Sequence, residues 1–201
     1  MLFSDRDRHI IRELARQVME IAALPVQEEK RAMWRKLNRL EKVRPLVWIN
    51  EIPWEELQGE ELDCQAEDGF CRGIEEQLRQ TLYLWRHMRT DMVVDGVFYS
   101  LYVYHDTGYS LEAQEVGSKS DFGRDCRDFV PVIKTETDIE RIQMPVITAD
   151  WEATERNYQM ACDLLDGVMP VQKRGVPHMW FAPWDDLIRW WGITELYTDM
   201  V

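Results

Sequence analysis

The sequence has no long apolar run and no apolar N-terminal segment, and each absence excludes a class of protein. No stretch of 18 consecutive apolar residues occurs, so the chain is not expected to span a membrane. The N-terminus reads MLFSDRDRHI, which is charged from its fifth residue and lacks the apolar centre of a signal peptide. We therefore expect a cytoplasmic protein.

Cysteine is scarce as well. The four cysteines form no CxxC pair and none lies at a metal-finger spacing from a histidine. Isolated cysteines of this kind are typical of reduced structural thiols in the cytoplasm. The sequence therefore offers neither a disulfide framework nor a recognisable metal site.

Positive charge is in the minority, with 24 Lys and Arg against 37 Asp and Glu and a formal net charge of −13. Binding to phosphates requires clustered Lys and Arg, so we expect neither nucleic acid nor an anionic membrane as a partner. A polyanionic substrate is also disfavoured unless a local basic pocket overrides the total charge.

Large apolar side chains are plentiful. Apolar residues make up 45% of the 201 residues, and nine Trp, seven Tyr and six Phe are enough for a substantial core. This composition and length are typical of one globular domain or a large piece of one.

The apolar pattern predicts helices alternating with short strands. Ser4 or Asp5 is expected to cap the first helix and Asp68 the third, while Gly167 and Gly192 end later ones. The predicted helices cover residues 5–24, 27–40, 70–88, about 150–165, 184–191 and 194–201, with a capping box at 137–140. The predicted strands cover residues 44–50, 91–95 with a β-rich continuation over 97–104, and 168–174. Residues 110–130 lack periodicity and are predicted to form a long loop. This alternation predicts a parallel sheet covered by helices.

Four stretches of the sequence resemble the uroporphyrinogen decarboxylase-like superfamily. They are RPLVWINE at 44–51, WRHMRTDMVV at 85–94, TDIERIQMP at 137–145, and VMPVQKRG at 168–175 running into FAPWD at 181–185. The resemblance extends from about residue 13 to residue 201 and implies an α/β fold, a (β/α)8 TIM barrel. The chain would supply only the N-terminal portion of that barrel. On this view residues 1–43 are an N-terminal helical extension, and residues 44–201 are the first, truncated part of an incomplete barrel.

The superfamily includes cobalamin-dependent methyltransferases that act on corrinoid proteins or coenzyme M. Resemblance to this branch implies transfer of a methyl group from a small methylated substrate, with zinc and a corrinoid as cofactors. The usual His-x-Cys zinc ligands lie in the second half of the barrel, and this chain contains no His-x-Cys. No metal ligand is therefore assigned within the chain.

Two alternatives stay open. Uroporphyrinogen decarboxylases carry arginines after the first barrel strand, because substrate carboxylates need fixed bidentate cations. The matching stretch here, residues 48–54, has no arginine, and Glu51 would repel a carboxylate. The other alternative is a non-catalytic remnant or a half-barrel that completes its sheet against a partner, since uncovered strand edges favour self-association.

Barrel enzymes place their active sites at the carboxyl ends of the strands, and this rule selects the candidate site residues. Glu51 and His105 are the catalytic candidates, as groups that can exchange protons. The predicted substrate-binding residues are Asn50, Arg174, His178 and Trp180. Loop polarity, turn formation and core packing are the competing explanations for the same residues.

Overall fold

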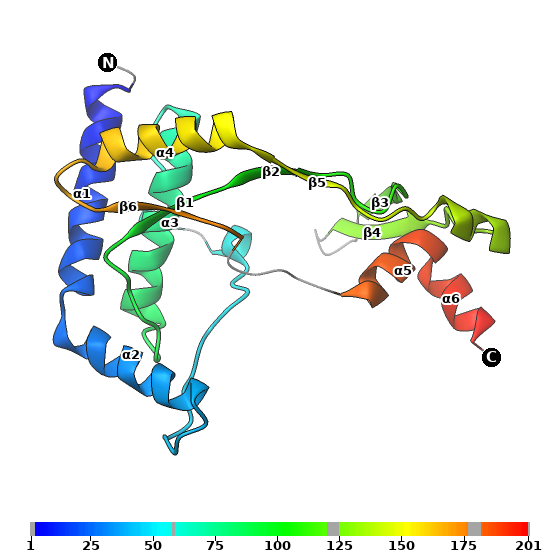
Figure 1. The fold of residues 1–201 in the computed structure, drawn as a ribbon, viewed down its shortest axis with the longest axis horizontal. Helices are drawn as coiled ribbons and strands as arrows, with labels where there is room; N and C mark the ends of the chain where they lie inside the picture. Colours follow the sequence, from blue (N-terminus) through cyan, green and yellow to red (C-terminus); the bar gives the residue numbers. More distant parts are fainter. Residues whose placement is uncertain (1–2, 58, 120–124, 177–181, 201) are drawn as a thin grey trace. The chain divides into compact units, whose positions relative to one another are not determined.

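The computed structural model describes residues 3–57, 59–119, 125–176 and 182–200. The chain is of mixed α/β structure and divides into two compact units (Figure 1). Unit 1 comprises the residues up to Leu101 together with Ala153–Arg174. Unit 2 comprises Tyr102–Glu152 and the residues from Gly175 onward. The boundary predicted after residue 43 falls inside unit 1.

Unit 1 is mainly helical, and its helices follow the predicted pattern. Ser4 caps the first helix by accepting a hydrogen bond from the Asp7 N–H, and Asp68 caps the third through the N–H groups of Phe70 and Cys71. Both predicted caps are confirmed. The helices are α1 (Asp5–Ala22), α2 (Pro25–Asn38), α3 (Gly69–His87) and α4 (Trp151–Leu165), with a 3-10 helix η1 (Trp54–Glu56) before α3.

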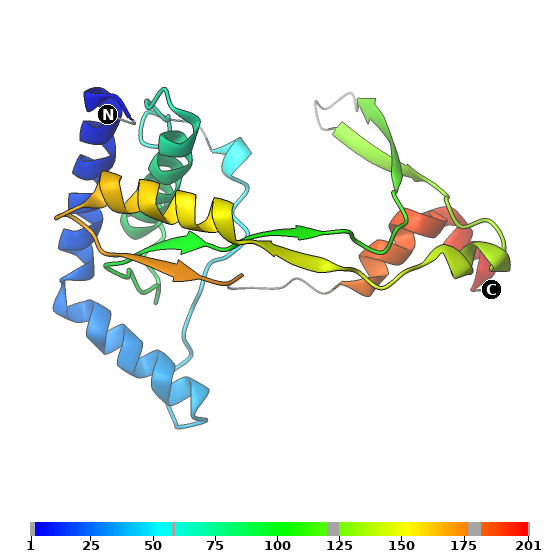
Figure 2. The same ribbon diagram turned by 45° about the horizontal axis from the view of Figure 1, so that its top comes forward.

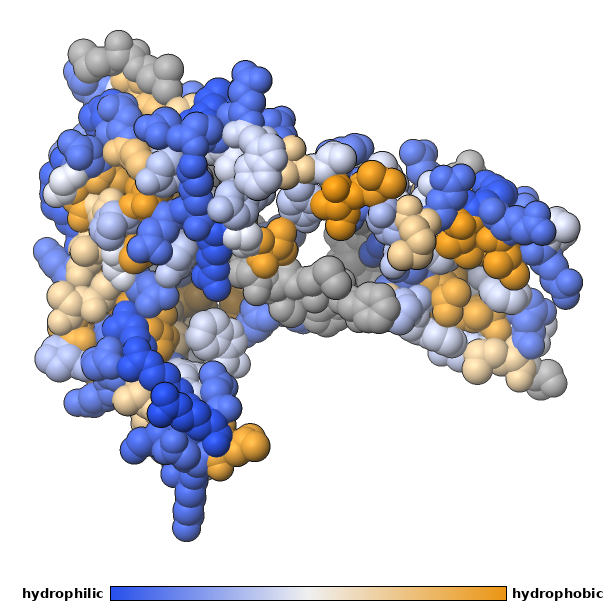
Figure 3. All heavy atoms as spheres, viewed as in Figure 1, coloured by the Kyte–Doolittle hydropathy of each residue, from blue (hydrophilic) through white to orange (hydrophobic). Residues whose placement is uncertain are grey.

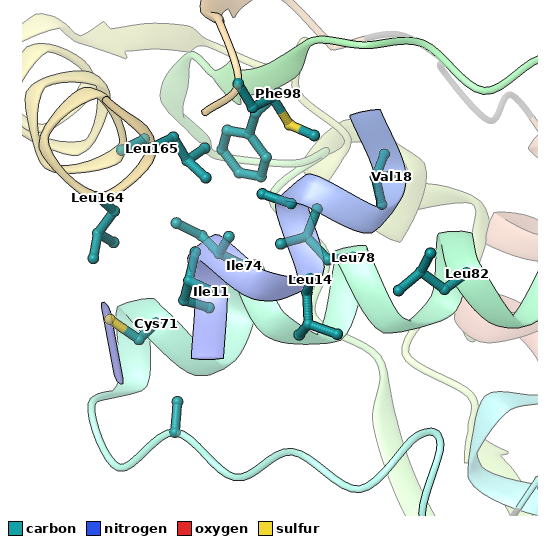
Figure 4. Packing of buried hydrophobic residues seen from close by; sticks show 14 of the residues in the cluster. Ile11, Leu14, Val18, Cys71, Ile74, Leu78, Leu82, Phe98, Leu164 and Leu165 are labelled. Carbon is teal, nitrogen blue, oxygen red and sulfur yellow. The ribbon is translucent and has the colours of Figure 1, made fainter. Parts of the chain in front are cut away.

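The core of unit 1 lies between α1, α3, α4 and the first strand (Figure 4). Each helix contributes one apolar stripe, because residues three and four apart share a helix face. The labelled side chains of the core are Ile11, Leu14 and Val18 from α1; Cys71, Ile74, Leu78 and Leu82 from α3; Phe98; and Leu164 and Leu165 from α4.

A parallel pair of strands completes unit 1. Strand β1 (Phe98–Leu101) lies beside β6 (Val171–Arg174), with Phe98 opposite Val171 and Leu101 opposite Arg174 (Figure 2). Helix α4 directly precedes β6, so the order is strand, helix, parallel strand, with the first segment of unit 2 inserted after β1. The predicted strands over 97–104 and 168–174 are confirmed in part, since each contains a shorter strand.

The strands predicted at 44–50 and 91–95 are wrong. Neither segment forms a ladder, although the two are joined by a hydrogen bond from the Asp91 N–H to the Val47 carbonyl at 3.1 Å. Pro45 has no N–H to donate, and the Val47 N–H is taken by the Asp91 carboxylate at 2.9 Å. A side chain therefore replaces the partner strand.

Unit 2 contains two antiparallel strand pairs and short helices. Strand β2 (Val103–Asp106) pairs with β5 (Ile147–Asp150), and β3 (Gln114–Lys119) pairs with β4 (Asp125–Val130). The long loop predicted over 110–130 is therefore wrong, because β3 and β4 are too polar to show an apolar alternation. The helices of unit 2 are η2 (Glu136–Arg141), α5 (Pro183–Trp191) and α6 (Ile193–Asp199).

The core of unit 2 is small. It consists of Leu111, Ile133 and Trp190, and the Trp190 carbonyl accepts hydrogen bonds from the N–H groups of Val132 and Ile133 at 2.7 and 2.9 Å. The capping box lies two residues earlier than predicted, at Thr135 and Asp138. Apolar side chains lie on the surface over β2 and β5 (Figure 3).

The strands of the described residues form three separate two-stranded pairs and close no barrel. The mixed α/β class is confirmed, whereas the barrel stays a prediction. Across the part of the chain that the structure describes, no helix is long and apolar enough to cross a membrane.

Candidate functional site

A groove in unit 1 contains two of the predicted site residues, Asn50 and Glu51. It has a volume of about 480 Å³ and lies between residues 48–54 and one face of α3. Its lining consists of Trp48, Ile49, Asn50, Glu51, Ile52 and Trp54 from the segment and Gln77, Gln80, Thr81 and Leu84 from α3.

Helix α3 forms one wall because its two faces differ in polarity. Gln77, Gln80 and Thr81 stand at helical spacing on the groove side, while Leu78 and Leu82 face the core. The Thr81 hydroxyl donates to the Gln77 carbonyl at 2.8 Å. The described residues of this wall combine three polar side chains with Leu84, and none of them is charged. The amide side chains of this face can therefore donate to or accept from a ligand.

A buried carboxylate holds the start of the opposite wall. Asp91 accepts hydrogen bonds from both terminal nitrogens of Arg44, at 2.9 and 2.5 Å, and from the Val47 N–H. These bonds, from Arg44 first and Val47 second, outweigh burial and lower the pKa of Asp91 to about 2. The Asp91 carboxylate thus fixes residues 44–47, and with them the position of the groove segment that follows.

Each of the two indole rings of the groove packs against another aromatic ring. Trp48 meets Trp34 of α2 edge to face, with centroids 6.1 Å apart, and the Trp34 Nε1–H donates to the Asp91 carbonyl at 2.8 Å. Trp54 meets Tyr83 of α3 in the same way at 6.0 Å. Edge-to-face pairs fix ring orientation, so both indoles are positioned before any ligand arrives.

Asn50 and Glu51 lie between the two tryptophans in sequence and are both exposed. Neither side chain has a hydrogen-bond partner among the described residues. The Glu51 backbone has φ +56°, a left-handed conformation that costs an L-residue about 1–2 kcal/mol. Strain of this kind persists where the surroundings impose it and is frequent at ligand-binding sites.

The other predicted site residues lie elsewhere. Arg174 ends β6 in unit 1, where its guanidinium stacks over the Tyr99 ring at 4.7 Å. His105 is exposed in β2 of unit 2, opposite Thr148 of β5. His178 and Trp180 fall outside the described residues.

The sequence reasoning missed the aromatic and amide members of the groove. Trp48 and Trp54 lie within four positions of Asn50 and Glu51, on either side of them. This aromatic pair was visible in the sequence. The polar face of α3 was also predictable, because Gln77, Gln80 and Thr81 lie outside its apolar stripe.

The described residues do not fit a zinc site. They contain no group of three or more His, Cys, Asp or Glu side chains that could hold a metal ion. Burial raises the pKa of Cys71 to about 12 and also raises the pKa of Cys64, which keeps both thiols protonated and poor as ligands. We therefore assign no zinc ligand to the described residues.

No protein-family model, curated protein or solved structure matches the chain.

Proposed function

We propose that the chain is the N-terminal part of a uroporphyrinogen decarboxylase-like methyltransferase barrel and that the groove of unit 1 binds its small methylated substrate. One observation carries the proposal: the unpartnered side chains of Asn50 and Glu51 lie in a groove walled by Trp48 and Trp54. The parallel pair of β1 and β6, with α4 directly before β6, supports a barrel origin for unit 1.

The groove suits a small molecule with apolar methyl groups and one polar centre. Methyl groups leave water favourably for an indole surface, and a few convergent polar groups then fix the orientation of the ligand. Here the Asn50 amide and the Glu51 carboxylate supply those groups beside the indoles. The proposal assigns substrate binding and orientation to this chain, and no step of methyl transfer to its residues.

The decarboxylase alternative is less well supported. Among the described lining residues there is no Lys or Arg, and Glu51 contributes a negative charge. The several carboxylates of a tetrapyrrole would meet repulsion there in place of bidentate cations. The non-catalytic alternative predicts that the groove binds no small methylated compound at all.

Saturation-transfer NMR tests the proposal on the full chain. The probes are a methyl ether, a methylated amine and a methyl thioether, observed through their methyl protons. We expect saturation of at least one class, weakened by Asn50→Ala and by Glu51→Gln. Glu55→Gln is the matched control, because Glu55 is an exposed carboxylate of η1 outside the groove lining.

Two results would contradict the proposal. One is the absence of saturation for all three classes, which would favour the remnant. The other is saturation that persists unchanged in Asn50→Ala and Glu51→Gln, which would move the binding site away from the groove.

A further inference from the structure

We infer that the ligand of the groove is a methylated ammonium cation. The inference rests on the proposed function for the place of the substrate and adds the charge that the substrate carries. It follows from the combination of two fixed indoles, one free carboxylate and a lining without a basic residue among the described positions.

The aromatic walls favour a cation whose charge is spread over methyl groups. Trp48 and Trp54 both line the groove, and indole is the side chain that attracts cations most strongly through its ring face. Trp48 remains 58% exposed although Trp34 packs against it, so it has indole surface left for a ligand. A methylated ammonium gains apolar contact and cation–π attraction from the same rings.

The charge of the groove points the same way. The Glu51 carboxylate forms no ion pair within the described residues, and no Lys or Arg among them lines the groove to neutralise it. A neutral methylated ligand would leave this carboxylate without a partner, and an anionic ligand would be repelled by it. A cation pairs with Glu51, and the net charge of −13 favours its approach.

A bare ammonium group suits the aromatic walls less well than a methylated one. An unmethylated ammonium is strongly hydrated and needs several acceptors to replace its water. Methylation removes these N–H donors and places apolar methyl groups against the indoles of Trp48 and Trp54.

A pair of isosteres tests the charge of the ligand. Choline and its neutral carbon isostere, 3,3-dimethylbutan-1-ol, have the same shape, and methylammonium adds a less methylated cation. Calorimetric titration of the full chain at constant ionic strength gives the three affinities. We expect choline to bind about tenfold or more tightly than either of the other two probes.

Variants then assign the binding to the groove. Glu51→Gln, Trp48→Leu and Trp54→Leu are each expected to weaken choline binding about five- to tenfold. Trp48→Phe, which keeps an aromatic face against Trp34, is expected to retain most of the affinity. Glu55→Gln and Trp184→Leu are the matched controls, because these exposed residues do not line the groove. Far-UV circular dichroism confirms that each variant folds.

The outcomes separate this inference from the proposed function. Equal binding of choline and its isostere would overturn the cation while leaving a methylated substrate in the groove. Equal binding of choline and methylammonium would overturn methylation as the selected feature. Saturation of the methyl ether or thioether in the NMR test without any choline binding would contradict the cationic ligand alone. The absence of binding in both experiments would contradict both the cationic ligand and the proposed function.

Discussion

The two units of this chain differ in how they bury their apolar residues. Unit 1 joins side chains from α1, α3, α4 and β1 into one continuous core, while the core of unit 2 consists of Leu111, Ile133 and Trp190. The strand pairs of unit 2 leave large apolar side chains exposed, including Val116 at 54% and Ile147 at 63%. Two-stranded pairs are marginal on their own, so we expect the stability of the chain to reside in unit 1, which also carries the groove.

The exposed apolar side chains of unit 2 bear on the predicted self-association. Ile147 in β5 is 63% exposed, and Trp151, which directly follows β5, is 67% exposed. Exposed apolar patches are typical of interaction surfaces. Among the strands of the described residues, β2 and β5 pair only with each other, so each has one outer edge. Self-association through such edges stays a prediction.

The largest effect is expected when one leucine is truncated in the core of each unit. Leu164 of α4 is fully buried in unit 1, and Leu111 is 8% exposed in unit 2. We expect Leu164→Ala to lower the free energy of unfolding by about 2–5 kcal/mol, because it leaves a cavity in a packed core. Leu111→Ala is expected to have a smaller effect, since its few neighbours can close around the gap.

Hydrogen exchange read by residue, together with urea unfolding, measures both effects. Leu164→Ala should speed exchange throughout unit 1, whereas Leu111→Ala should speed it only in unit 2. An equal loss of protection in both units for either variant would mean that the two units unfold as one.

Acid unfolding offers a second, smaller comparison. The pKa of Asp91 in unit 1 is lowered to about 2 by hydrogen bonds from Arg44 and the Val47 N–H. The pKa of Asp138 in unit 2 is lowered to about 2 by hydrogen bonds from the backbone N–H of Lys134 and from the hydroxyl and N–H of Thr135. A depressed folded-state pKa gives stability that is present above the unfolded pKa near 4 and is lost as pH falls toward 2.

We expect Asp91→Asn to lower the free energy of unfolding at pH 7 by roughly 1–2 kcal/mol. Asp91 is buried, but the effect is limited because Arg44 is half exposed and its charge is screened by water. The difference from the wild type should shrink between pH 4 and pH 2. Asp138→Asn should show the same pH window with a smaller amplitude, because its side chain is partly exposed. Unfolding at a series of pH values checks this, and a constant difference down to pH 2 would rule out the linkage.

The sequence predicted the helices of unit 1 well because their signals are local. Ser4 and Asp68 cap α1 and α3, and the stripes of α1 and α3 lie in the core. The strands were predicted poorly, because the Asp91 carboxylate, 44 positions from Val47 in the sequence, decides that residues 44–50 form no ladder. A pairing of that range is tertiary and leaves no periodic pattern in the segment itself.

Part of the candidate site was also predictable. Asn50 and Glu51 are candidates because they directly follow an apolar run in the sequence, and both line the groove. The prediction assumed a strand that does not form, so its structural reason was wrong, and the role of the two residues stays a prediction. The contribution of α3 requires knowing that residues 48–54 lie against that helix, which no local signal states.

The smallest comparison concerns backbone strain in the two units. Glu51 in unit 1 and Ser110 in unit 2 both have left-handed backbones, with φ +56° and +63°. Glycine relieves about 1–2 kcal/mol of strain at such a position and costs about 0.5–1 kcal/mol through its more flexible unfolded state. We therefore expect Glu51→Gly and Ser110→Gly each to stabilise the chain by about 0.5–1 kcal/mol.

The two variants should differ in binding, and that difference connects strain to function. Glu51→Gly removes the groove carboxylate together with the strain, so it should gain stability and lose choline affinity, whereas Ser110→Gly should gain stability alone. Glu51→Ala is the matched control, because it removes the carboxylate and keeps the strained backbone. If Glu51→Gly is no more stable than Glu51→Ala in urea unfolding, the left-handed backbone at Glu51 stores no strain, and the stability of unit 1 is not reduced by its groove.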